Sequence, residues 1–286
     1  MKARYVNPFT DFGFKKIFGE EASKPMLIDF LTSLLPESKI VDLAFKDKEK
    51  LGRSDEDRKA IYDIYCETES GEKIIVELQK AKQKYFKDRT VYYASFPIQE
   101  QAERGDWNYQ LKYVYCVGVL DFRFEDDQVG NGEVIHSIQL KDQNNQVFYD
   151  KLKFVYLEMP NFNKSEADLV MRLDKWLYFI KHLEDFQNIP DIFGDEIFKQ
   201  AFEKAEIANY STEERDEYEQ SLKNYRDLKG VIDNAFDEGI EKGKIEGKYE
   251  VAKSMKLAGE TVAKIMLYTG LSEEEINELQ KNMLQY

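Results

Sequence analysis

The alternation of apolar and polar residues is clearest in two short runs on either side of a turn signal. Residues 60–66 and 73–80 are rich in valine, isoleucine and tyrosine, which favour a pleated, half-buried surface. Between the runs lie Glu69, Ser70 and Gly71, and a glycine supplies the positive φ that a short hairpin loop needs. We therefore predict a β-hairpin with a three-residue loop.

The register of this hairpin brings polar residues together. A three-residue loop places Asp63 directly across from Glu77. Because side chains alternate along a strand, Glu77 and Gln79 share one face, whereas Val76 and Leu78 point to the other. The pattern therefore predicts a polar cluster of Asp63, Glu77 and Gln79 on an otherwise apolar hairpin.

Further apolar runs indicate more strands. Residues 113–122, YVYCVGVLDF, are almost continuously apolar, as expected for a central strand that is covered on both faces. Residues 40–45 are typical of a first or edge strand, and residues 134–140 and 152–157 of two more, separated by the turn-rich KDQNNQ. Strands and helices do not alternate strictly, which favours a mixed α/β sheet with helices on both sides.

Helical periodicity predicts the remaining elements of the first half. Residues 7–18 are typical of a loop that enters a short helix, which Thr10 or Asp11 can cap. Residues 23–35 predict a second helix and residues 84–104 a long third one. The positions expected to lie on the buried stripe of the third helix are Tyr85, Tyr92, Phe96 and Gln99.

The character of the chain changes after about residue 160, where amphipathic helices replace strands. We place the change between residues 160 and 190. The resulting division is a sheet-bearing core over 1–160, a helical extension over 161–250, and a small C-terminal cap over 251–286.

The helical extension ends in glycines that recur every four residues, Gly239, Gly243 and Gly247. Four-residue spacing places them on one stripe of a helix, where they allow another helix to approach closely. Glycine is unfavourable in a water-exposed helix, so the segment is either frayed or ordered with a partner. We favour association with a protein partner or a second copy over disorder.

The last residues are similar to a helix-turn-helix, with one helix over 261–268 and another from Ser272. A helix that reads DNA presents Arg, Lys, Asn or Gln to the bases. The second helix instead begins with three glutamates, residues 273–275, which repel phosphate. A packing or dimerisation cap is the better interpretation.

Composition narrows the class of protein. With 42% hydrophobic residues the chain can bury a sizeable core. We expect no membrane span, because no run of about 18 apolar residues exists, and the first residues lack the apolar stretch of a signal peptide. Cys66 and Cys116 fall within predicted strands, so we expect buried free thiols in a reducing cytoplasm.

The net charge of −14 counts against a simple nucleic-acid-binding protein, since neutralisation of phosphates supplies much of the affinity for DNA. The charge is uneven, however. Residues 80–89, KAKQKYFKDR, carry five basic residues and one acidic one directly after the predicted polar cluster. A local basic patch beside this acidic cluster is compatible with DNA cleavage if the cluster holds a metal ion.

Two neighbouring carboxylates repel each other unless a divalent cation lies between them. Carboxylate oxygens, completed by water and phosphate oxygens, are ligands that Mg²⁺ prefers, and such an ion activates water against a phosphodiester. The alternative is a half-exposed strand whose acids face water. Spacing alone leaves both interpretations open.

Asp63, a hairpin and then Glu77-Leu78-Gln79 resemble the D…(D/E)xK half-motif of the PD-(D/E)XK nuclease superfamily, in an ExQ form. The flanking segments 7–19, 76–79 and 88–122 are similar to the Rpn family of recombination-promoting nucleases and transposases. The resemblance covers residues 1–160 well and the C-terminal tail more loosely.

The resemblance implies a restriction-endonuclease-like fold and a DNA endonuclease that depends on Mg²⁺, with Mn²⁺ as a substitute. Asp63 and Glu77 would hold the metal, the backbone carbonyl of Leu78 would add a ligand, and Gln79 would orient water or phosphate. Homo-oligomers through the C-terminal helices are also expected. The residues that match auxiliary or phosphate-binding positions of the family are Asp11, Lys15, Lys82, Arg89, Tyr93 and Gln101.

The departure from the superfamily pattern is Gln79 in place of lysine. An amide has no charge and cannot act as a base, so activation of water would depend on the metal or on a lysine from elsewhere, such as Lys15 or Lys82. A nuclease fold without activity, which acts as an interaction module through its acidic helical tail, is the alternative function. The sequence does not separate DNA from RNA as the substrate.

Overall fold

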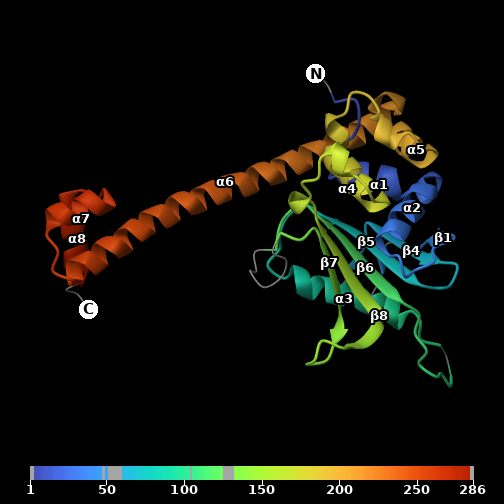
Figure 1. Cartoon of the computed structure of the whole chain (residues 1–286), viewed down its shortest axis with the longest axis horizontal. Coiled ribbons are helices and arrows are strands. Elements are labelled where there is room, and N and C mark those ends of the chain that lie inside the picture. Colours follow the sequence, from blue (N-terminus) through green and yellow to red (C-terminus); the bar gives the residue numbers. More distant parts are fainter. Residues whose placement is uncertain (1–2, 47–48, 51–59, 104, 125–131, 284–286) are drawn as a thin grey trace. The chain divides into compact units, whose positions relative to one another are not determined.

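The structure is a computed structural model that describes residues 3–46, 49–50, 60–103, 105–124 and 132–283 (Figure 1). The chain divides into two compact units, residues 1–226 and residues 227–286. The boundary expected near residue 160 therefore falls inside the first unit.

The first unit is built on a mixed six-stranded sheet with the strand order β1-β4-β5-β6-β8-β7. The three central strands β5, β6 and β8 run parallel to one another, and the remaining neighbours are antiparallel. The strands are β1 Leu43–Phe45, β4 Ile64–Thr68, β5 Lys73–Gln79, β6 Val114–Leu120, β7 Ile135–Lys141 and β8 Val147–Glu158. A separate two-stranded sheet joins β2, Glu49–Lys50, to β3, Ala60–Ile61.

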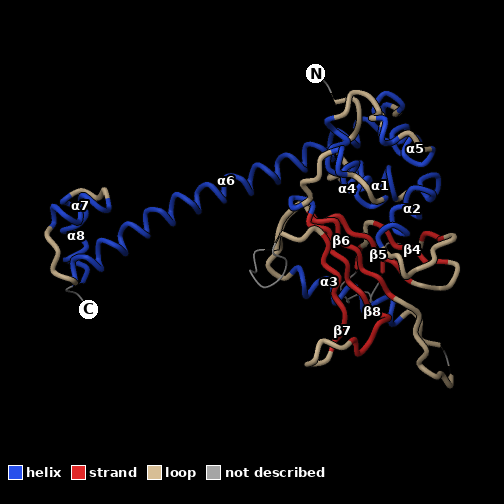
Figure 2. Tube along the Cα trace, viewed as in Figure 1, coloured by secondary structure: helices blue, strands red, loops and turns tan. Residues whose placement is uncertain are grey.

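Helices cover both faces of the large sheet, as Figures 1 and 2 show. On one face lie α1, α2, α4 and α5, and on the other lies α3. Their bounds are α1 Asp11–Phe18, α2 Lys24–Leu34, α3 Phe86–Gln99, α4 Arg172–His182 and α5 Glu196–Ala205. Single 3₁₀ turns lie between these elements: η1 Glu21–Ser23, η2 Met159–Asn161, η3 Glu166–Asp168, η4 Leu183–Asp185, η5 Asp191–Phe193 and η6 Ile207–Asn209. The arrangement confirms the predicted mixed α/β fold with helices on both sides and a C-terminal helical region.

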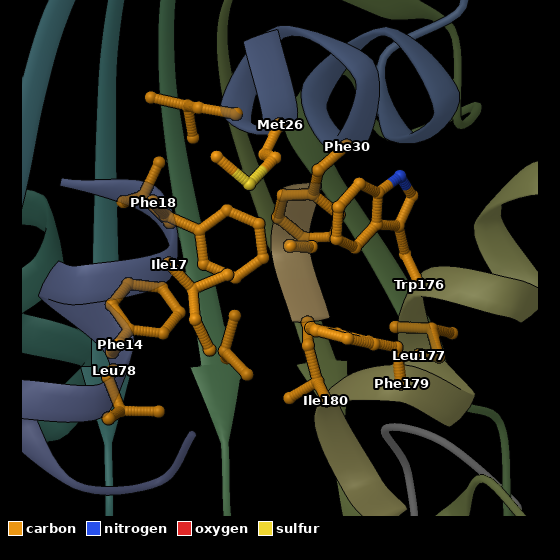
Figure 3. Packing of buried hydrophobic residues seen from close by; sticks show 14 of the residues in the cluster. Phe14, Ile17, Phe18, Met26, Phe30, Leu78, Trp176, Leu177, Phe179 and Ile180 are labelled. Carbon is orange, nitrogen blue, oxygen red and sulfur yellow. The ribbon is translucent and has the colours of Figure 1, made fainter. Parts of the chain in front are cut away.

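The main core lies between the sheet and the four helices on its first face. Phe14, Ile17 and Phe18 of α1 belong to this core. Figure 3 shows these side chains packed beside Phe30 of α2 and Trp176 of α4. Helices from beyond residue 160 thus bury the same sheet face as the N-terminal helices.

The other face packs against α3, where the predicted stripe is only partly correct. Phe96 packs against this core as expected. Tyr85, Tyr92 and Gln99 are exposed, however, and the buried residues of α3 are Phe86, Ala94 and Pro97. The buried side of the helix therefore differs from the one that the tyrosines indicate. The helix also ends at Gln99, two residues after Pro97.

The helix α6, Thr212–Leu257, runs across both units and is continuous through its glycines. Its first turns belong to the core of the first unit: Tyr218, Leu222 and Tyr225 are buried there. Ser211 and Glu214 cap its N-terminus reciprocally.

The second unit combines the end of α6 with α7, Val262–Thr269, and α8, Glu273–Met283. Ala252, Ile265, Leu271 and Ile276 form its small core. Gly270 has a φ of 69° and ends α7, and Ser272 with Glu275 caps α8. The helix-turn-helix-like pair expected here is therefore present as a packed cap on α6.

Candidate metal centre

The candidate site lies where the hairpin of β4 and β5 becomes irregular. Gly71 has a φ of 86°, and the register pairs Ile64 with Val76, which confirms the predicted three-residue loop. The expected continuous strand over 60–66 is interrupted, because Asp63 forms a bend between β3 and β4. The bend frees the Asp63 side chain to turn back toward the main chain of β5.

Across the hairpin, the Asp63 and Glu77 carboxylates each accept a hydrogen bond from the backbone of the opposite segment, Asp63 from Leu78 and Glu77 from Asp63. The Leu78 N–H donates to Oδ2 of Asp63 at 2.8 Å, and the Asp63 N–H donates to Oε1 of Glu77 at 3.3 Å. The two carboxylates predicted to meet are thus brought together. Only about one fifth of the Asp63 side chain is exposed.

The ionised forms of both acids in this pair are unfavourable. Burial raises the pKa of Asp63, while the Leu78 N–H and Lys15 lower it. Burial, followed by repulsion from Asp63, raises the pKa of Glu77 to about 8. Positive charge between two such acids favours their ionised forms. A divalent cation between them would supply it.

Gln79 lies on the same strand face as Glu77, next to α3. Its Oε1 accepts a hydrogen bond from Arg89, and its Nε2 donates to the Ala81 carbonyl at 2.8 Å. Arg89 also donates to Oε1 of Gln83 at 2.6 Å. These contacts set the orientation of the Gln79 amide. They use only one of the two hydrogens on its Nε2.

A small cavity lies beside Glu77, between the sheet and α3. The space open to the centre of a water molecule is about 20 Å³, enough for one water by that measure. Arg89, Tyr93, Gly118 and Tyr156 also line it. The Arg89 Nε is buried and finds no hydrogen-bond partner among the residues that the structure describes, and the guanidinium lies 5.6 Å from the centre of the Tyr93 ring.

Helix α1 brings the charged residues Asp11 and Lys15 to the end of the hairpin that carries Asp63 and Lys80. Lys15 Nζ lies 3.8 Å from Oδ1 of Asp63, and Asp11 forms an ion pair with Lys80 at 2.8 Å. Lys80 follows Gln79 directly and reaches α1, and its charge lowers the pKa of Asp63. Its position directly after the Glu-Leu-Gln motif was the available signal.

The remaining predicted residues lie elsewhere. Lys82 is exposed and lines a cleft at the start of α3, together with Lys84, Lys87 and Phe122. Gln101 follows the other end of α3, where its Oε1 accepts from the Lys112 N–H at 2.6 Å. Gln101 therefore connects α3 to the segment before β6 and does not join Asp63 and Glu77.

One residue that sequence reasoning missed is Gly118 of β6, paired with Glu77. A Cβ at this position would lie 2.7 Å from Cδ1 of Tyr156. The glycine lets the Tyr156 ring lie against the sheet beside the cavity. A lone glycine in a continuous apolar strand was the signal.

A family model of "PD-(D/E)XK nuclease family transposase" matches residues 8–235. The chain belongs to this family. The match confirms the family suspected from the sequence and supports a nuclease- or transposase-type function. No curated protein and no solved structure matched the chain significantly.

Asp63 and Glu77 stay the candidates for the two acidic positions of the PD-(D/E)XK pattern, and Gln79 the candidate for its lysine position. Among the described residues there is no cluster of three or more His, Cys, Asp or Glu side chains suited to a metal. Two carboxylates with backbone, water and phosphate oxygens are a donor set that fits Mg²⁺. No described helix has the length and apolar character required to cross a membrane.

Proposed function

We propose that this chain is an endonuclease that hydrolyses DNA phosphodiesters with a divalent cation, Mg²⁺ or its substitute Mn²⁺. The observation that carries the proposal is the partly buried pair of Asp63 and Glu77, which the backbone N–H groups of Leu78 and Asp63 hold across the hairpin and whose mutual repulsion raises the pKa of Glu77. A family whose members are nucleases supports the same chemistry.

Asp63 and Glu77 would hold the metal, with the Leu78 carbonyl as a further ligand. When bound, the ion would lower the pKa of a water ligand and neutralise charge on the phosphate. The hydrogen bond from Leu78 to Asp63 orients one acid in advance, and β5 holds the other.

Lys15 is the best replacement for the lysine that position 79 lacks. Its Nζ lies 3.8 Å from Asp63, and about 44% of its side chain is exposed, so it can reach a substrate as well as the acid. Lys82 lies in the cleft at the start of α3 and is better placed to contact a phosphate farther along the strand. Gln79, held by Arg89, would offer its remaining N–H to a phosphate or water oxygen.

The nucleic acid itself would be contacted through the basic segment at the start of α3. Lys82, Lys84 and Lys87 line a cleft of about 330 Å³ with the aromatic rings of Phe122 and Phe124. Lysines neutralise phosphates, and aromatic rings accept stacked bases. This segment would give a substrate local positive charge on a chain whose net charge is −14.

The site would act in the cytoplasm. Both cysteines, Cys66 and Cys116, are free and buried, and burial raises the pKa of each thiol. Unreactive thiols of this kind suit a reducing compartment. A role in DNA recombination, of the Rpn type, belongs to the same proposal.

The proposal is tested by nicking of supercoiled plasmid DNA with Mg²⁺, Mn²⁺ or chelator. We expect Asp63→Ala and Glu77→Ala to abolish metal-dependent nicking. Glu69→Gln is the matched control, because Glu69 is an exposed acid in the turn of the same hairpin. Cleavage at the wild-type rate by both purified alanine variants rejects the assignment, and a parallel assay with single-stranded RNA decides between the substrates.

The second candidate is a nuclease fold without activity that serves as an interaction module through its acidic helical tail. The neutral Gln79, with both its oxygen and its nitrogen already bonded, favours this alternative. Calorimetric titration with Mg²⁺ or Mn²⁺ separates the two. Binding that is lost in Asp63→Ala supports the nuclease, and the absence of any carboxylate-dependent binding supports the interaction module.

A further inference from the structure

The part of α6 in the second unit, residues 227–257, carries a row of large apolar side chains toward solvent. These are Leu228, Ile232, Phe236 and Ile240, spaced by four residues. Each is exposed over more than a third of its surface, and Phe236 over 67%. An exposed apolar row of this length on a charged helix marks an interaction surface.

A second row of the same helix consists of small residues. Gly239, Gly243 and Gly247 follow the large row, and a Cβ built on any of them would meet nothing within 4 Å. The glycines are therefore not required by packing within the chain, although glycine is among the least favourable residues for a helix interior. At about 100° per residue, both rows fall on one face of the helix.

The charges that border this face change sign along the helix. Asp233 and Asp237 lie at one edge beside the large row, and Lys244 and Lys248 continue the same edge beside the glycines. All four are exposed. Residues 227–241 carry five acids and one lysine, whereas residues 242–257 carry five lysines and two acids. The charges of this segment therefore complement those of a second copy of the segment that runs in the opposite direction.

We propose that α6 pairs in antiparallel orientation with α6 of a second copy of this chain, about a two-fold axis between residues 240 and 241. This inference goes beyond the proposed nuclease function and does not depend on it. The large row of one copy lies in the glycine groove of the other, which is ridge-into-groove packing.

The register follows from both rows and from the charges. Phe236 inserts between Gly243 and Gly247 of the second copy, and Ile240 between Gly239 and Gly243. In the same register Asp237 lies opposite Lys244, and Asp233 opposite Lys248. A parallel pairing would instead place aspartate against aspartate and lysine against lysine, which is unfavourable.

The first test separates helix stability from pairing. Leucine favours a helix more than glycine does, so Gly243→Leu with Gly247→Leu should raise the helical signal in circular dichroism. In analytical ultracentrifugation of the full chain, the same variant should weaken dimerisation by roughly tenfold or more, because the groove is filled. Gly230→Leu is the matched control, since Gly230 lies on the charged face of the same helix and also meets open space.

The second test uses charge. Lys244→Glu with Lys248→Glu should dissociate the dimer. Adding Asp233→Lys and Asp237→Lys to the same chain should restore the dimer, and this fourfold variant has the same net charge as wild type. Restoration supports the antiparallel pairing. A wild-type chain that stays monomeric across the concentration series overturns the proposal, as does a glycine variant that dimerises like wild type or a fourfold variant that stays monomeric. Plasmid nicking by the same variants reports separately on the nuclease.

Discussion

At the scale of single residues, the site depends on two acids that are placed beside each other at an energetic cost. Asp63 and Glu77 are both largely buried, and the pKa of each is raised. Groups that destabilise the folded protein until a ligand arrives are typical of functional sites. The cost should therefore be measurable as a dependence of stability on pH.

In the presence of chelator, Glu77→Gln should stabilise the protein increasingly as the pH rises. The pKa of Glu77 is 4.5 in the unfolded chain and about 8 in the folded chain, so the folded state keeps the Glu77 proton up to a higher pH. Below about pH 4.5 both states are protonated, and between these values wild-type stability falls as the pH rises. We expect the variant to exceed wild type by roughly 1–3 kcal/mol at pH 9, measured by urea unfolding from pH 5 to 9. A difference that stays constant with pH would contradict this account.

Lys15→Met should lower kcat for DNA cleavage by roughly 10- to 100-fold with little change in stability. The Lys15 side chain is partly exposed and lies 3.8 Å from Asp63, so its ion pair contributes little to folding. Steady-state kinetics with thermal melts measure both effects. Lys15→Arg should restore part of the rate, and exposed Lys39 offers the control Lys39→Met. An unchanged kcat in Lys15→Met would exclude this lysine from the chemistry.

At the scale of elements, α1 is held between the sheet and the first turns of α6. The Asn7 N–H donates to the Tyr218 hydroxyl at 3.0 Å, and the Phe12 N–H donates to Ser221 at 3.1 Å. Lys16 of α1 also pairs with Glu214. Since α1 carries Lys15, the start of α6 positions part of the site.

Tyr218→Phe should destabilise the protein by about 1–3 kcal/mol, because the buried Asn7 N–H loses its acceptor. Metal binding should persist, because Asp63 and Glu77 lie on other elements. Chemical denaturation and calorimetry measure the two properties. Tyr268→Phe, at an exposed tyrosine of α7, is the control and should leave stability unchanged. Loss of metal binding in the folded Tyr218 variant would show that α6 reaches the acids directly.

At the scale of the whole molecule, the sheet and the helices beyond residue 160 share one core. Phe179, Phe198 and Phe202 of α4 and α5 belong to the same buried cluster as the N-terminal helices. The backbone of the N-terminal segment also bonds the end of α5, where the Val6 N–H donates to the Ala205 carbonyl at 3.0 Å. A nuclease unit cut at residue 160 would leave this face uncovered.

A fragment of residues 1–226 should therefore fold cooperatively and keep metal-dependent cleavage, whereas a fragment of residues 1–160 should aggregate or remain partly unfolded. The exposed apolar face of the shorter fragment is the physical reason. Light scattering and thermal unfolding of both fragments test this, with the full chain as reference. Cooperative unfolding of the shorter fragment would support the boundary that the sequence indicates.

Local chemistry made several features predictable. Gly71 and the Val- and Ile-rich runs fixed the hairpin and its register, because loop length determines which residues face each other. The central strand β6 and the reciprocal caps of α6 and α8 were also predictable. Each depends on residues within a few positions of one another.

Features that depend on distant parts of the chain were not predictable. The bend at Asp63 is coupled to the Leu78 N–H, and the choice among Lys15, Lys80 and Lys82 depends on how α1 lies against the sheet. The buried side of α3 depends on the tight fit of Ala94, which no local pattern reveals.

The sequence by itself determined the hairpin, its three-residue loop and the position of the two acids across from each other, since turn chemistry and side-chain alternation act over short distances. Only the tertiary structure decided which lysine side chain approaches Asp63, how Arg89 holds Gln79, and which helices share the core. Those arrangements arise when faces from distant segments bury one another, and many sequences with the same local pattern can satisfy that requirement differently.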